Sequence, residues 1–288
     1  MPTRRRSTHA PRGDAIAPAP PPEPIEAAHH DADLKPPSAW KMMLESRAPW
    51  EFAATFISMT ALARAPRGDG HPVIVFPGLV ANDVTTAPLR QYLAWLGHAS
   101  YPWSLGVNLG PREGVLDQCR ELVRELYLRH GERVSLIGWS LGGIYARELA
   151  KEFPHFTRCV ITLGTPFSGH PRATNAWRLY RYVSGHDPVD DETLHHLREP
   201  PPVPTTSLYS RTDGVVSWRC SLNPRGPRAE NIEITASHFG MGMNPLALYA
   251  IADRLAQVPE TWQRFEATGA WRYFYGRQRD PSSHHGDD

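Results

Sequence analysis

The amino-acid sequence predicts an α/β protein with a mostly parallel central sheet and helices on both faces. Short β-branched runs alternate with stretches of apolar residues at helical spacing between residues 71 and 256. Several of these segments end at a glycine or a Pro-Gly pair, where strands and helices commonly stop. Strands that alternate with helices are typical of a parallel sheet with both faces covered.

The individual elements follow from local patterns. Strands are expected over six short segments, of which the first is a β-branched run closed by Pro-Gly: residues 71–78, 98–103, 133–138, 157–163, 205–210 and 231–235. Helices are expected over residues 86–97, 111–130, 141–152 and 245–256, and the first two end at Gly97 and Gly131. Residues 166–204 hold many polar, aromatic and proline residues but no clear strand. They are predicted to form a small cap insertion above the sheet.

The segments on either side of this domain, which we bound at residues 67–275, differ from it in composition. Residues 1–37 contain nine of the 29 prolines and almost no large apolar side chains, which predicts a disordered arm. Over residues 38–66, apolar residues recur at roughly helical spacing with a break at Pro49, which predicts two short helices. These helices either pack on the body or, through residues 40–62, offer an apolar surface to a membrane or lipid. Residues 276–288 are expected to be a polar tail.

Composition argues against several classes of protein. The 31 basic and 30 acidic residues nearly balance, so no nucleic-acid partner is expected. The three widely spaced cysteines form no CxxC pair, which favours buried free thiols in a reducing compartment. No signal peptide and no apolar run long enough to span a bilayer are seen, so a cytoplasmic location is expected. The histidine pairs 29–30 and 284–285 lack further ligands, so we expect no metal and no cofactor.

Ser140 is the first candidate for chemistry, because it stands in G138-W-S-L-G142 between an expected strand and an expected helix. Glycines on both sides of a serine allow a tight turn that lets the hydroxyl protrude at the edge of a sheet. The positive end of the following helix would then point to a developing oxyanion. The alternative is an ordinary turn between strand and helix with an inert serine.

A serine hydroxyl needs a base, and the base needs a carboxylate to orient it. In a strand–turn–helix arrangement the acid and then the histidine follow the serine along the chain. His238 stands on a loop after the last strand, and Asp213 on a loop after the strand before it. Asp213 precedes Gly214, which is also an ordinary turn signal. The competing acids, all in the insertion, are Asp187, Asp190 and Asp191.

Two backbone amides are expected to form an oxyanion hole. One belongs to Leu141, the residue after the serine. The other should come from the loop after the first strand, where Gly78 allows a close approach. We assign it to Leu79, with Val80 as the alternative.

Together these motifs resemble the α/β-hydrolase superfamily, and within it the bacterial lipase and esterase-like branch. The resemblance covers residues 73–256 and is carried by F76-P-G-L79, G138-W-S-L-G-G143, L163-G-T-P-F-S-G169, S210-R-T-D-G-V-V-S-W218 and S237-H238. It implies Ser140 as nucleophile, Asp213 as acid and His238 as base. The chain has Pro77-Gly78 where many lipases have His-Gly. The backbone amide of this loop can still serve the oxyanion hole, but the difference weakens an assignment to lipases in particular.

The expected function is hydrolysis of carboxylic esters, small-molecule or lipid, through a serine acyl-enzyme. Transfer of the acyl group to another acceptor uses the same residues and stays open as an alternative, as does a non-catalytic binding protein with this fold. Aromatic side chains that either line an acyl-chain site or belong to the core are Trp103, Phe167, Trp177, Tyr180 and Tyr182.

Overall fold

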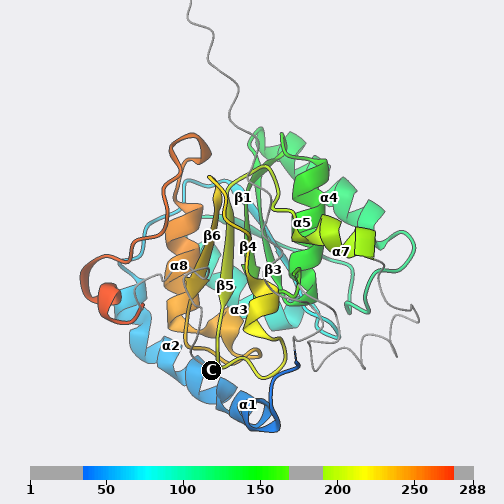
Figure 1. Ribbon diagram of the computed structural model, residues 1–288. Coiled ribbons are helices and arrows are strands. Elements are labelled where there is room, and N and C mark those ends of the chain that lie inside the picture. Colours follow the sequence, from blue (N-terminus) through cyan, green and yellow to red (C-terminus); the bar gives the residue numbers. More distant parts are fainter. Residues whose placement is uncertain (1–34, 169–190, 276–288) are drawn as a thin grey trace, which may run out of the picture.

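A six-stranded parallel sheet forms the centre of the computed structural model, which describes residues 35–168 and 191–275 (Figure 1). Neighbouring strands run in the order β2-β1-β3-β4-β5-β6, and every pairing is parallel. This confirms the predicted fold class. The strands are β1 (Pro72–Phe76), β2 (Ala99–Pro102), β3 (Val134–Trp139), β4 (Thr157–Leu163), β5 (Thr205–Tyr209) and β6 (Ala229–Glu233).

Helices cover both faces of the sheet (Figure 1). The larger ones in the body are α3 (Asp83–Leu96), α4 (Val115–His130), α5 (Leu141–Glu152) and α8 (Pro245–Leu255). Side chains of β1 show how the two cores are divided, because successive residues of a strand point to opposite faces. Val73 and Val75 lie in the core with α3 and α8, whereas Ile74 and Phe76 lie in the core with α4 and α5. The sheet is therefore buried on both faces.

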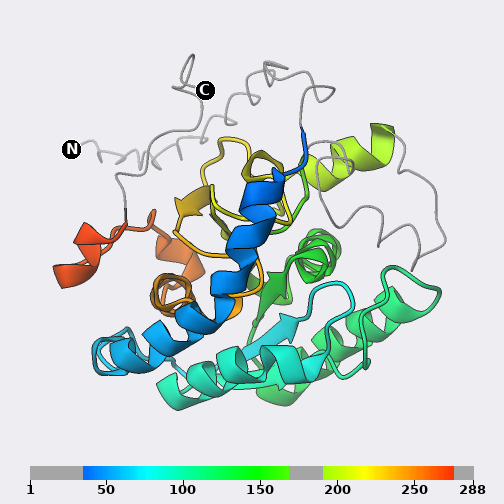
Figure 2. The ribbon, with the colours of Figure 1, turned by 90° about the horizontal axis from the view of Figure 1, so that it is seen from below.

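Two helices, the first short and the second longer than expected, precede the sheet and cross the edge where its strands end (Figure 2). They are α1 (Ala39–Leu44) and α2 (Ala48–Leu62), separated by the single 3-10 turn η2 (Glu45–Arg47). The break falls before Pro49 rather than at it. A proline lacks only an amide that the first turn of a helix leaves unpaired, so Pro49 lies at the start of α2 instead of ending a helix.

The side of α1 and α2 that faces the body is largely polar. Glu45, Thr55 and Leu62 are buried, while the large apolar residues point outward. We call these exposed residues the apolar face; they are Trp40, Met43, Trp50, Phe52, Phe56 and Ile57. Ile57 is 85% exposed and Trp50 is 76% exposed. The segment thus packs on the body through polar contacts and, near the end of α2, through Met59 and Leu62, and it leaves the apolar face uncovered.

Shorter elements complete the described residues. The end of the expected insertion forms α7 (Asp191–Arg198), and further 3-10 turns are η4 (Trp218–Ser221), η5 (Met241–Met243), η6 (Pro259–Thr261) and η7 (Gly269–Tyr273). The expected arm up to residue 34, residues 169–190 of the insertion and the tail 276–288 lie outside the described residues. The three cysteines are buried free thiols, as predicted. None of the helices in residues 35–168 and 191–275 is long and apolar enough to cross a bilayer.

Candidate active site

Ser140 occupies a strained turn between β3 and α5. Its φ of 52° and ψ of −123° are rarely adopted by a residue with a side chain. The flanking glycines are required because the neighbouring backbone leaves no room for a side chain at either position. A Cβ on Gly138 would lie 2.3 Å from the Gly143 Cα, and one on Gly142 would lie 2.4 Å from the Phe76 carbonyl oxygen. The half-buried Ser140 also caps α5, whose positive end therefore points to it.

The order of the strands places this turn at the switch point of the sheet. After β1 the chain moves outward to β2, and it then returns to place β3 on the other side of β1. At such a switch point the loops that follow the two central strands separate and leave a crevice. The Pro77–Leu79 loop follows β1 and Ser140 follows β3, so both line this position.

Asp213 and His238 form a buried pair on the loops that follow β5 and β6. The Asp213 Oδ2 atom lies 2.7 Å from the His238 Nδ1 atom. The other carboxylate oxygen, Oδ1, accepts hydrogen bonds from the amides of Val215 and Val216, both at 2.8 Å. Because both oxygens have partners, the carboxylate is fixed in orientation and in turn fixes the imidazole ring.

Three contacts bring this pair to the serine. The Ser140 amide donates to the Leu163 carbonyl oxygen at 2.8 Å, and the next residue, Gly164, lies against the pair. A Cβ on Gly164 would lie 3.0 Å from the Asp213 Oδ2 atom and 3.1 Å from the His238 Nδ1 atom. On the other side of the serine, the Trp139 indole donates to the His238 carbonyl oxygen at 3.0 Å. The structure therefore brings Ser140, Asp213 and His238 to one edge of the sheet.

The electrostatic surroundings of His238 favour its protonated form. Burial by itself would lower the pKa of His238, but the charge and hydrogen bond of Asp213, together with the charge of Glu45, outweigh burial. The pKa of His238 is consequently raised above its usual value. A ring in this environment is a stronger base than an isolated histidine.

The loop after β1 is held by a buried asparagine, Asn108. Its side-chain amide donates to the Pro77 carbonyl oxygen at 2.8 Å, and its backbone pairs with Val80 and Ala81. The Val80 amide is engaged in that pairing, at 2.7 Å from the Asn108 carbonyl oxygen. No described residue accepts a hydrogen bond from the Leu79 amide. This difference favours Leu79 over Val80 as a free donor.

Leu141 offers the second amide of the expected oxyanion hole. As the first residue of α5, it has an N–H that no carbonyl group of its own helix can reach. A Cβ on Gly78 would lie 3.2 Å from the Ser140 Cβ, so the loop that carries Leu79 passes directly beside the serine.

One carboxylate that sequence reasoning missed, Glu45 of η2, joins the two loops that carry the Asp213–His238 pair. Its Oε1 atom accepts the amides of Gly214 at 2.7 Å and His238 at 3.0 Å, and its Oε2 atom accepts the amide of Phe239 at 3.0 Å. Gly214 follows the acid directly and is pressed against α1, where a Cβ would lie 2.3 Å from the Lys41 carbonyl oxygen. No motif in the sequence connects Glu45 to residues so far along the chain.

Neighbouring charges of the same helical segment reinforce this connection. Glu51 accepts the Ser237 amide at 2.7 Å and pairs with Arg47 at 2.9 Å. Arg47 in turn donates to the side chain of Thr212 at 2.6 Å. The segment from α1 to α2 thus contacts the loops after β5 and β6, which carry Asp213 and His238, through buried or half-buried polar groups.

Other residues singled out in the sequence do not lie at this site. His195 and His196 are exposed on α7, and His196 pairs with Glu148 instead. Trp103 is 2% exposed and packs in the core, and buried Phe167 lies under the Arg147 guanidinium, 3.7 Å from its carbon to the ring centre. Positions that fall outside the described residues or side chains are Trp177, Tyr180, Tyr182, Asp187, Asp190 and Asp191.

Known proteins resemble this chain in fold but not in sequence. No family model and no curated protein matches the sequence. Lipase B of Aspergillus fumigatus superposes with a TM-score of 0.53 and 17% identity, over 68% of this chain and 55% of the lipase. The propeptide form of the Bacillus licheniformis lipase BlEst2 gives a TM-score of 0.50 and 17% identity, over 72% of this chain and 54% of the lipase. The chain spans about half the length of each, and identities this low speak for the fold alone.

Proposed function

Because the chain has the α/β-hydrolase fold, we propose that it is a serine hydrolase that cleaves carboxylic esters. One observation carries this proposal: a buried Asp213–His238 pair lies beside a serine in a strained turn at the switch point of the sheet. A structural histidine would not require a glycine at residue 164 or a strained serine at residue 140 in the same place.

In the proposed reaction, His238 takes the proton of the Ser140 hydroxyl as the Oγ atom attacks the ester carbonyl carbon. The tetrahedral intermediate collapses, and His238 gives the proton to the departing alcohol. Water then repeats the attack on the acyl-enzyme with His238 as base, which releases the acid and restores Ser140. Asp213 holds the ring and stabilises its positive charge in both halves.

The amides of Leu79 and Leu141 are the proposed donors to the oxyanion. Loss of one such donor typically costs about 10²- to 10³-fold in kcat, so their placement matters as much as that of the base. Asn108 is proposed to position the Leu79 amide, because it fixes the loop on both sides of that residue.

Glu45 is proposed as a positioning residue for the base and the acid. It touches no reacting atom, but its carboxylate ties the residue after Asp213 to His238 itself. Its charge also contributes to the raised pKa of His238.

We further propose that the protein binds its ester substrate at a lipid surface. The apolar face on α1 and α2 supports this, because those helices border the catalytic loops. Phe239 follows the base, is 61% exposed, and its amide bonds to Glu45 between the two helices. Exposed apolar side chains this numerous are typical of contact with a membrane or lipid aggregate.

Hydrolysis of p-nitrophenyl esters of increasing chain length tests the reaction and its substrate class together. Ser140→Ala should lower kcat by about three orders of magnitude or more. A variant as active as the wild type would exclude Ser140 as nucleophile. Activity confined to acetate and butyrate esters would indicate an esterase and exclude a lipid substrate. Transfer of the acyl group to added alcohols would indicate a transferase.

A further inference from the structure

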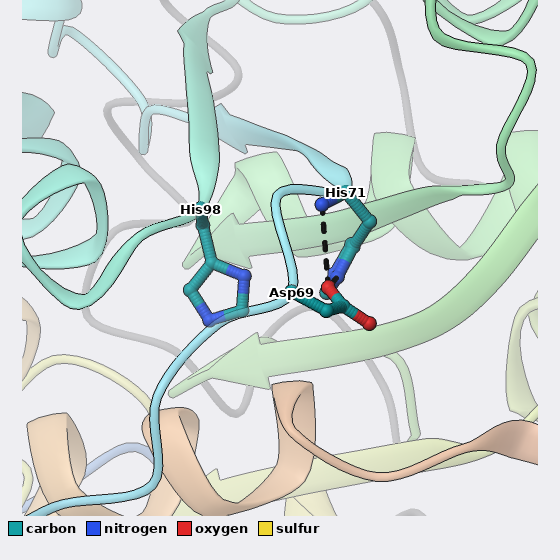
Figure 3. Close-up of side chains that lie close together, drawn as sticks. All are labelled: Asp69, His71 and His98. Atoms are coloured by element: carbon teal, nitrogen blue, oxygen red, sulfur yellow. Dashed lines mark hydrogen bonds and ion pairs between the residues drawn. The ribbon is translucent and has the colours of Figure 1, made fainter.

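Three residues with metal-binding side chains lie together at the amino ends of the strands, at the opposite edge of the sheet from Ser140 (Figure 3). Asp69 and His71 come just before β1, and His98 comes just before β2. One ligand atom of each lies within 4.8 Å of the others. The two histidine rings meet edge to face with centres 4.8 Å apart.

His98 is the residue that the fold leaves unexplained. It is 4% exposed, and neither of its ring nitrogens has a hydrogen-bond partner among the described residues. Buried polar groups nearly always have a partner, and leaving one without costs about 1–3 kcal/mol. In Figure 3 one of the two ring nitrogens of His98 lies on the side of Asp69 and His71.

The other two residues are already oriented by outer partners. The His71 Nδ1 atom lies 2.5 Å from the Asp69 Oδ1 atom, while its Nε2 atom lies 2.8 Å from the Ser135 hydroxyl. The second oxygen of Asp69 pairs with Arg158 at 2.9 Å. Metal-binding histidines and carboxylates are commonly held in this way, with one atom facing the ion and the other bonded behind.

We propose that Asp69, His71 and His98 bind one zinc ion through Oδ1, Nδ1 and one ring nitrogen, respectively. Two imidazoles and one carboxylate suit zinc, whereas magnesium and calcium prefer all-oxygen sites. The ligand atoms of a tetrahedral zinc lie about 3.4 Å apart, so the ion would open the direct Asp69–His71 bond and draw His98 inward. Asp69 is half exposed, and its Oδ2 atom can keep the ion pair with Arg158 while Oδ1 turns toward the ion.

Binding moves one proton. The proton that the neutral His71 ring shares with Asp69 moves from Nδ1 to Nε2 by exchange with water. Nδ1 can then give its lone pair to zinc while Nε2–H donates to the Ser135 hydroxyl oxygen, and no net proton is released. Water supplies the fourth ligand on the half-exposed side of Asp69. The ion would tie the loop before β1 to the start of β2, which makes it a stabilising ion and not a part of the ester chemistry.

Zinc titration of the full chain after dialysis against EDTA tests this site, with cobalt as a spectroscopic probe. The wild type should bind one tight equivalent, show the visible bands of tetrahedral cobalt and unfold at higher temperature with zinc. His98→Ala should weaken that site by at least about 100-fold and Asp69→Asn by at least about tenfold. Asp69→Asn serves as the second variant because its exposed side chain makes loss of folding a small concern.

Matched controls separate this site from other histidines and from the hydrolase. His195→Ala removes an exposed histidine on α7 and should leave the tight equivalent unchanged. Ser140→Ala should bind zinc as the wild type does, so failure of the proposed hydrolysis would not affect the result. Absence of a tight equivalent in the wild type, or its survival in His98→Ala and Asp69→Asn, would overturn the proposal.

Discussion

Replacing Glu45 with glutamine should loosen the two loops that hold Asp213 and His238. Glutamine keeps one oxygen for the amides of Gly214 and His238, but its NH₂ group would face the Phe239 amide, donor against donor. One hydrogen bond to a charged group is lost, at about 1.5–3 kcal/mol, and two more become neutral. We expect the free energy of unfolding to fall by about 2–4 kcal/mol and kcat/KM to fall roughly 10- to 100-fold.

A pH profile distinguishes this role from simple loss of stability. The groups whose charges raise the pKa of His238 are Asp213 and Glu45. The imidazole must be neutral to act as base, so the acidic limb of kcat/KM follows that pKa. Removing the Glu45 charge lowers the pKa of His238, so the limb should move to lower pH. Exposed Glu121→Gln on α4 is the matched control and should change neither quantity. An unmoved limb in folded Glu45→Gln, with full activity, would refute the reasoning.

Three other substitutions probe the neighbouring groups. Gly164→Ala places a methyl group 3.0 Å from the Asp213 Oδ2 atom at a φ of +53°. We expect kcat/KM to fall about 100-fold in steady-state assays. Unchanged kinetics would show that a methyl group at residue 164 does not displace Asp213 or His238. Asn108→Ala removes the bond to the Pro77 carbonyl oxygen and should lower kcat about 10- to 100-fold with little change in KM, and a change in KM alone would argue against control of the oxyanion loop. The double variant Trp50→Glu, Ile57→Glu should hydrolyse emulsified long-chain esters at least about tenfold more slowly, while its rate on a soluble butyrate ester should not change. An equal loss of rate on both substrates would contradict a surface role for the apolar face.

Most of the fold could be predicted from the sequence because strands and helix ends are marked by residues close together along the chain. The central strands β1, β3 and β4 are mainly apolar runs of a few residues. Gly97 and Gly131 end their helices in the left-handed conformation that glycine allows. Pro49 misled in one respect. Its position relative to the helix start decides whether it breaks or begins a helix, and local spacing did not reveal that start.

The three residues of the proposed triad could be selected from the sequence because chain order and loop position restrict the choice, although 14 histidines by themselves do not. Glu45 could not be found in this way. Its partners Gly214 and His238 are distant along the chain and contribute only backbone amides, which leave no trace in residue type. His98 was missed for a similar reason, because only the pairing of β1 with β2 brings it close to His71.

Labelling with a fluorophosphonate probe measures the central proposal most directly, because such probes react with a serine only when a neighbouring base and oxyanion donors activate it. The wild type should take up one probe per chain, on the peptide that contains Ser140, and Ser140→Ala should take up none. His238→Ala, which keeps the serine but loses its base, should label far more slowly. A wild-type chain that stays unlabelled, or a probe attached to any other residue, would contradict a serine hydrolase built on Ser140.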